Sequence, residues 1–136
     1  MYSSAADAHP NRETEPLDLA HLDRQTLGDR DLQRELLALF ATQSPPLVAR
    51  MRALGYGEPA AFADLAHHLK GSARAIGAVG VAALATDLEE AARREAMRLA
   101  APASGKPETR NHSPRDLAAL EAALAAAIVA IDALLI

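Results

Sequence analysis

The stretch PAAFADLAHHLKGSARAIG, residues 59–77, carries the clearest helical pattern in the chain. Its apolar residues recur at spacings of three and four, at Phe62, Leu65, Leu69, Ala73 and Ile76. At 100° per residue these positions form one stripe, which predicts an amphipathic helix from Pro59 to Ile76. The proline suits the first helical turn, where its missing amide costs nothing, and a glycine follows the last apolar residue.

Two helices are predicted before this stretch. Asp18 can cap a short helix over residues 19–26. An acidic residue, Asp29 or Asp31, opens a longer helix, and the pair Pro45-Pro46 removes two amide donors and should kink or divide it. The inward positions predicted for these helices are Leu19, Leu22, Leu27, Leu32, Leu36, Leu39, Phe40, Leu47, Met51 and Leu54.

Two more long helices are predicted after the quoted stretch. Residues 77–80 form a turn by composition, and a helix follows over about 81–99. A loop is expected over 101–113, and Ser113 can cap a last helix over about 114–134, which has proline in its first turn. The inward positions predicted here are Val81, Leu84, Leu88, Ala92, Leu99, Leu117, Leu120, Leu124, Ile128, Ile131 and Leu135.

The composition supports a helical fold of one domain. The 136 residues include 33 alanines and 20 leucines but only two Phe, two Tyr and no Trp, so strong helix formers outnumber the residues that favour strands. We predict an all-α fold, an antiparallel four-helix bundle with a short extra N-terminal helix. The bundle domain is expected over residues 17–136, after a flexible leader over 1–16.

Several functional classes are excluded by simple counts. The chain has no cysteine, which rules out disulfides, a thiolate zinc site and a cysteine nucleophile. Its net charge of −4 argues against nucleic-acid binding. No uninterrupted run of 18 apolar residues and no signal-peptide pattern is present, so neither a membrane span nor secretion is expected. We therefore predict a cytoplasmic monomer that binds neither nucleic acid nor membrane.

The outward face of the helix over 59–76 is unusual. His67 and Gly71 each lie about 160° from the centre of its apolar stripe. Glycine in mid-helix costs about 1 kcal/mol relative to alanine, so its presence suggests that another molecule comes close to the histidine. The group that approaches could be a phosphoryl group, because histidine forms covalent intermediates as a nucleophile. The remaining outward positions are Lys70 and Arg74, which could neutralise an anion, and Ala60 and Ala63. The alternative is an ordinary surface histidine beside a lysine.

The residues around His67 resemble a known signature. AHHLKGS, residues 66–72, followed by Gly77 ten residues after His67, resembles the A-H-x-L-K-G-S/A pattern of histidine-containing phosphotransfer (HPt) domains. The family pattern continues with a Leu-Glu pair late in the next helix, which Leu88-Glu89 supply. With the opening leucine-rich segment and the proline in the second helix, the resemblance spans about residues 17–136.

The resemblance implies roles for four residues. His67 would be phosphorylated through its Nε2 atom. Lys70 would help to neutralise the phosphoryl charge, and Gly71 would leave space for the phosphoryl group and the partner. Glu89 would accept a hydrogen bond from Nδ1–H, which fixes the tautomer and leaves Nε2 free. The alternative, which we favour less, is that Glu89 is a solvated acid on an amphipathic helix, since Glu90 is adjacent.

Other residues near the signature receive weaker assignments. Arg74 and Ser72 are candidates for the phosphoryl environment. The partner-facing candidates are Ala60, Ala63, Asp64 and His68, and Asp64 could hydrogen-bond to His68 four residues later.

The resemblance also implies partners and a reaction. HPt domains relay phosphoryl groups to or from aspartates of response-regulator receiver domains, or take them from a sensor histidine kinase. They are carriers rather than enzymes and hold no cofactor, since the magnesium ion belongs to the receiver domain. This chain resembles a free-standing shuttle. The alternatives are a non-phosphorylated adaptor that binds receiver domains, a domain phosphorylated directly by a kinase, and a metalloprotein that uses the pair His67-His68. The last is disfavoured because adjacent helical residues diverge by about 100°.

Overall fold

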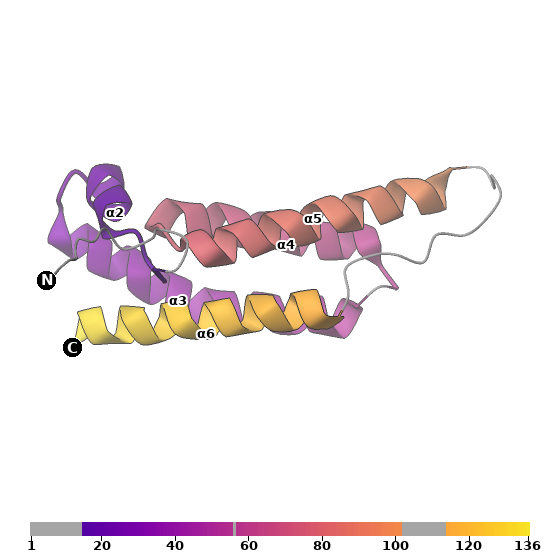
Figure 1. Cartoon of the computed structure of the whole chain (residues 1–136). Coiled ribbons are helices and arrows are strands. Elements are labelled where there is room, and N and C mark those ends of the chain that lie inside the picture. Colours follow the sequence, from indigo (N-terminus) through magenta and orange to yellow (C-terminus); the bar gives the residue numbers. More distant parts are fainter. Residues whose placement is uncertain (1–14, 56, 102–113) are drawn as a thin grey trace, which may run out of the picture.

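The computed structural model describes residues 15–55, 57–101 and 114–136, with side chains of the last segment described from residue 116. These residues form helices and no strands, which confirms the all-α prediction (Figure 1). The helices are α2 (Leu19–Thr26), α3 (Arg30–Leu54), α4 (Pro59–Ile76), α5 (Val79–Ala100) and α6 (Pro114–Leu135). Most of the predicted leader, nearly all of the predicted loop and the cap at Ser113 lie outside the described residues.

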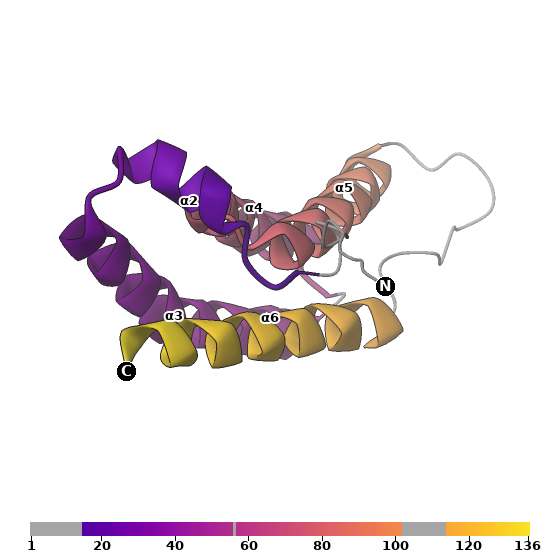
Figure 2. The ribbon, with the colours of Figure 1, turned by 60° about the vertical axis from the view of Figure 1, so that its left-hand side comes forward.

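The four long helices enclose a single core. Helix α4 contacts both α3 and α5, and α6 contacts the same two helices, so each long helix has two long neighbours. The short helix α2 lies against α3 and α4 (Figure 2). The chain thus places α4, which carries the quoted sequence, directly beside α5.

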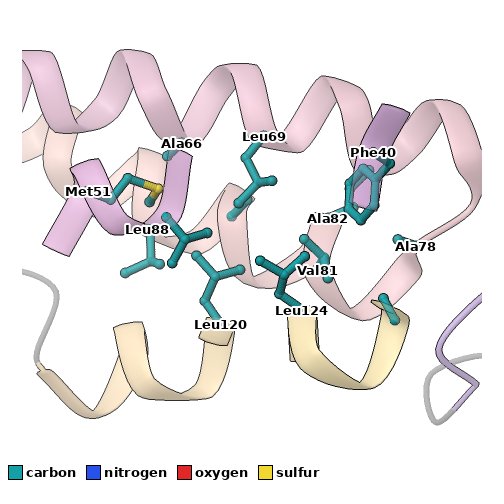
Figure 3. Packing of buried hydrophobic residues seen from close by; sticks show 14 of the residues in the cluster. Phe40, Met51, Ala66, Leu69, Ala78, Val81, Ala82, Leu88, Leu120 and Leu124 are labelled. Atoms are coloured by element: carbon teal, nitrogen blue, oxygen red, sulfur yellow. The ribbon is translucent and has the colours of Figure 1, made fainter. Parts of the chain in front are cut away.

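Alanines and leucines fill this core in different places. On α4 and α5 many of the buried residues are alanines, whose small side chains let two helices pack closely. Leucines and a methionine fill the space toward α3 and α6, as Figure 3 shows for Met51, Leu88, Leu120 and Leu124. The fully buried alanines of α4 and α5 are Ala63, Ala66, Ala73, Ala85 and Ala92.

The end of α4 is fixed by a glycine. Gly77 caps the helix with a positive φ of 81°, a conformation that L side chains rarely adopt. Its carbonyl accepts a 2.7 Å hydrogen bond from the amide of Asp18, the residue that caps α2. A Cβ atom at this position would lie 2.6 Å from the Asp18 carbonyl oxygen. Glycine is therefore required where α2 docks on α4. Nearby, the His21 ring donates from Nε2 to the Arg74 carbonyl at 2.7 Å.

The two prolines of helix α3 were predicted to kink or divide it. The helix is not divided, because it continues through both of them. The helix runs for 25 residues with Pro45 and Pro46 inside. Both prolines are exposed, and so is Thr42, whose carbonyl loses the amide partner that Pro46 lacks. Buried Ser44 and Val48 flank the pair and hold the helix against the core on either side.

Several predicted inward leucines are exposed, and these predictions were wrong. Leu27 is the clearest case, with 92% of the residue exposed, because it adopts the left-handed conformation that ends α2. The others lie at the edges of their stripes or near helix ends, where the neighbouring helices do not cover them: Leu19, Leu32, Leu39 and Leu99. Helix α5 begins at Val79, whereas the sequence predicted residue 81. The turn is shorter than the predicted 77–80, because α4 ends at Gly77.

Helix α6 is strongly apolar, although the sequence holds no uninterrupted run of 18 apolar residues. Residues Asp116–Leu135 have a mean hydropathy of 2.1 and are long and apolar enough to cross a membrane by length and composition alone. Its leucine and isoleucine stripe, including Leu120, Leu124 and Ile131, is buried against the other helices. A core helix in a bundle of this kind meets the same criteria, so the finding is weak support for a membrane span.

Candidate functional site

His67 lies on α4 and faces α5, with its side chain 63% exposed. Its Nδ1 atom lies 2.9 Å from Oε2 of Glu89 on α5. An ionised carboxylate only accepts hydrogen bonds, so the ring donates its Nδ1 proton, and in the neutral ring Nε2 carries the free lone pair. The hydrogen bond that the sequence predicted between these two residues is therefore present. An exposed imidazole in this tautomer is able to attack an electrophile through Nε2.

Lys70 approaches the same carboxylate from one turn further along α4. Its Nζ atom lies 2.6 Å from Oε1 of Glu89, and the two side chains are only 17% and 11% exposed. The two oxygens of Glu89 thus contact different residues of α4, one the histidine ring and the other the lysine. The lysine is held beside the ring by this ion pair.

The charge of Glu89 is maintained by its neighbours. Burial by itself would raise the pKa of this carboxyl group. Hydrogen bonds and electrostatic attraction from Lys70 and His67 outweigh burial and leave the pKa of Glu89 lowered. Glu89 is therefore ionised at neutral pH and remains an acceptor for the Nδ1 proton.

Arg93 is a site residue that the sequence analysis missed. Its Nη2 atom lies 3.4 Å from Oε2 of Glu89, the oxygen that also contacts His67. Its Nη1 atom lies 3.1 Å from Oδ1 of Asp64 on α4. The spacing of four between Glu89 and Arg93 on one helix was the available signal. The structure pairs Asp64 with Arg93 across the two helices, where the sequence suggested His68 as its partner.

Gly71 lies in open space one turn after His67. A Cβ atom built there would meet no atom within 4 Å. Internal packing therefore gives no reason for a glycine at this position. The glycine does keep the surface beside the ring low, which leaves room for an approaching molecule.

The remaining candidates divide into exposed and buried residues. Ala60, His68 and Arg74 are exposed, and Ser72 is half-buried. Ala63 is fully buried, so its prediction as a partner-facing residue was wrong. Because α4 packs between α3 and α5, its buried sector is wider than the apolar stripe alone suggested.

The described residues offer no group of three or more His, Cys, Asp or Glu side chains that could hold a metal ion. Of the two adjacent histidines, His67 is the one that hydrogen-bonds to Glu89.

A comparison with protein families agrees with this geometry. The model of the Hpt domain matches residues 35–130, a range that includes His67, Lys70, Glu89 and Arg93. No curated protein and no solved structure matches the chain. The match covers well over half of the sequence and all of the site, and the chain therefore belongs to the Hpt domain family.

Proposed function

We propose that the protein carries a phosphoryl group on Nε2 of His67 in a two-component phosphorelay. Membership of the Hpt domain family implies histidine phosphotransfer in two-component signalling. The observation that carries the proposal for this chain is the Nδ1 contact of the exposed His67 ring with Glu89, at 2.9 Å. In the neutral ring this contact leaves Nε2 as the nucleophilic nitrogen, on a side chain that is 63% exposed.

The donor would be an aspartyl phosphate on a receiver domain, or a phosphorylated histidine kinase. The Nε2 lone pair forms a bond to phosphorus while the bond from phosphorus to the donor atom breaks, and its electron pair returns to the donor. The Nδ1 proton stays on the ring, and the resulting positive charge faces the carboxylate of Glu89. Donation to a response-regulator aspartate is the same step reversed.

Lys70 and Gly71 serve the transferred group in this proposal. Lys70 is held one turn from His67, so its ammonium group is able to turn from Glu89 toward the phosphoryl oxygens. Gly71 leaves the approach clear. Arg74 and Ser72 lie further along the same helix and complete the environment.

The protein in this proposal is a carrier, not an enzyme, and the magnesium ion is bound by its receiver partner. The partner approaches the face that Ala60, Asp64, His68 and Gly71 line. We propose that the four long helices form an antiparallel bundle, and that the protein acts in the cytoplasm as a monomer.

Two matched variants test the assignment of His67. His67→Gln should abolish acceptance of phosphate from a phosphorylated receiver domain, whereas His68→Gln should keep most of it. Both histidines are exposed on α4, so the second variant controls for the loss of an imidazole from this surface. The reverse pattern would overturn the assignment. Receiver binding without any transfer in the wild type would favour the adaptor alternative.

A further inference from the structure

The ion pairs around His67 join two cations with two anions. Lys70 pairs with Glu89, and Arg93 pairs with both Glu89 and Asp64. The four side chains therefore balance in charge before any phosphoryl group arrives. A phosphoryl group adds roughly two negative charges at neutral pH, and these four side chains hold no net positive charge to neutralise it.

Asp64 is the most exposed of the four residues, and Arg93 joins it to the others. Its side chain is 74% exposed, and its ion pair is with Nη1 of Arg93 at 3.1 Å. It lies three residues before His67, on the same face of α4. The other nitrogen of Arg93, Nη2, reaches the Glu89 oxygen that accepts from His67. Arg93 thus links Asp64 to the reacting ring.

We propose that Asp64 raises the phosphoryl-transfer potential of His67 by holding the positive charge of Arg93 away from the phosphoryl group. The inference rests on the proposed function of His67. With Asp64 ionised, Arg93 divides its two nitrogens between two carboxylates, and Asp64 itself repels the phosphoryl oxygens. The phosphorylated state is then less stable, and donation is favoured. Asp64 is a positioning residue that acts through Arg93.

The step concerned is loss of the phosphoryl group from His67. The bond from Nε2 to phosphorus breaks and its electron pair returns to Nε2, while phosphorus bonds to an oxygen of the acceptor. The acceptor is a receiver carboxylate in the relay and water in spontaneous hydrolysis, where the water proton passes to the product phosphate or to solvent. The ring leaves as neutral imidazole, with its Nδ1 proton still on the ring and hydrogen-bonded to Glu89. A cation that stabilises the bound phosphoryl group more than the transition state slows this step.

The test uses the full chain labelled with phosphoramidate, a small donor that needs no protein partner. Asp64→Asn should lengthen the half-life of phosphorylated His67 by about two- to fivefold at low ionic strength. The half-life is measured by phosphorus NMR. Asp87→Asn is the matched control, since Asp87 is also exposed but lies on α5, about 200° around that helix from Glu89. Its half-life should equal that of the wild type.

Two further readouts separate an electrostatic effect from a structural one. The difference between Asp64→Asn and the wild type should shrink as salt is raised to about 1 M, where charges are screened over a few ångströms. Asp64→Glu should restore the short half-life. In an Arg93→Gln background, Asp64→Asn should have a smaller effect, because the cation that Asp64 holds is gone. An equal effect in that background would overturn the role of Arg93.

The outcomes distinguish this inference from the proposed function. If the wild type takes no label on His67, the proposed function itself fails. If His67 is labelled but Asp64→Asn has the same half-life as the wild type, only the role of Asp64 fails.

Discussion

At the scale of single residues, Glu89 connects everything at the site. It accepts from His67, pairs with Lys70 and contacts Arg93, all from a position that is nearly buried. A carboxylate in such a position stays ionised only because its hydrogen-bond and ion-pair partners compensate for the lost hydration. Its spacing of 22 residues from His67 could be predicted from the family pattern. The contact of Arg93 with Asp64 could not, because it depends on how α4 and α5 are aligned across their interface.

The lowered pKa of Glu89 predicts a specific pH dependence of stability. A carboxyl group whose pKa is lower in the folded than in the unfolded state stabilises the fold above its unfolded pKa. This contribution is lost as the pH falls through the folded pKa. Urea unfolding should therefore show that Glu89→Gln loses less stability than the wild type when the pH is lowered from about 6 to about 3. An equal loss would mean that the ion pairs of Glu89 do not stabilise the fold.

Gly71 offers a prediction in which stability and function separate. Gly71→Ala should stabilise the protein by up to about 1 kcal/mol in urea unfolding, because the added methyl group meets no other atom and alanine favours helix. Gly71→Glu should also fold, but it should block phosphotransfer through bulk and negative charge beside His67. Normal transfer by Gly71→Glu would contradict the proposal that the partner approaches His67 over this position. Destabilisation by Gly71→Ala would contradict the open space around residue 71.

At the scale of helices, the ends are set by glycine and proline and the faces by packing. Pro59 and Gly77 made the limits of α4 predictable to the residue. The faces were less predictable, because burial depends on neighbours that lie far away in the sequence. Ala63 is buried since α4 has a neighbour on each side, and Leu39 is exposed although it fits the spacing of α3.

The junction of α2 with α4 can be tested through its glycine. Gly77→Ala should destabilise the protein by about 1–3 kcal/mol, because alanine is strained at a φ of 81° and its Cβ would clash with the Asp18 carbonyl. Gly80→Ala is the control, since its Cβ would lie 3.9 Å from the nearest atom, within an ordinary helix. Thermal unfolding should show a lower Tm for the first variant only. Similar Tm values for the two variants would argue against close packing of α2 on α4 at Gly77.

At the scale of the whole molecule, His67 and the side chains grouped around it lie on α4 and α5, while α3 and α6 complete the core. The two supporting helices are also joined at the surface, where Arg52 of α3 forms a two-pronged ion pair with Glu121 of α6 at 2.7 and 2.6 Å. The all-α fold could be predicted from the sequence because alanine and leucine recur at helical spacing throughout. The charge balance around His67 required the structure, because its members come from two helices.

Locating the label on the phosphorylated protein tests whether Nε2 of His67 carries the phosphoryl group. The wild type should be phosphorylated by a receiver domain or by phosphoramidate, and then analysed by phosphorus NMR and by mass spectrometry of its peptides. We predict a single acid-labile, base-stable label on His67, bonded to Nε2. A label on His68, or an acid-stable label on another type of residue, would contradict the assignment of His67 as the phosphorylated residue.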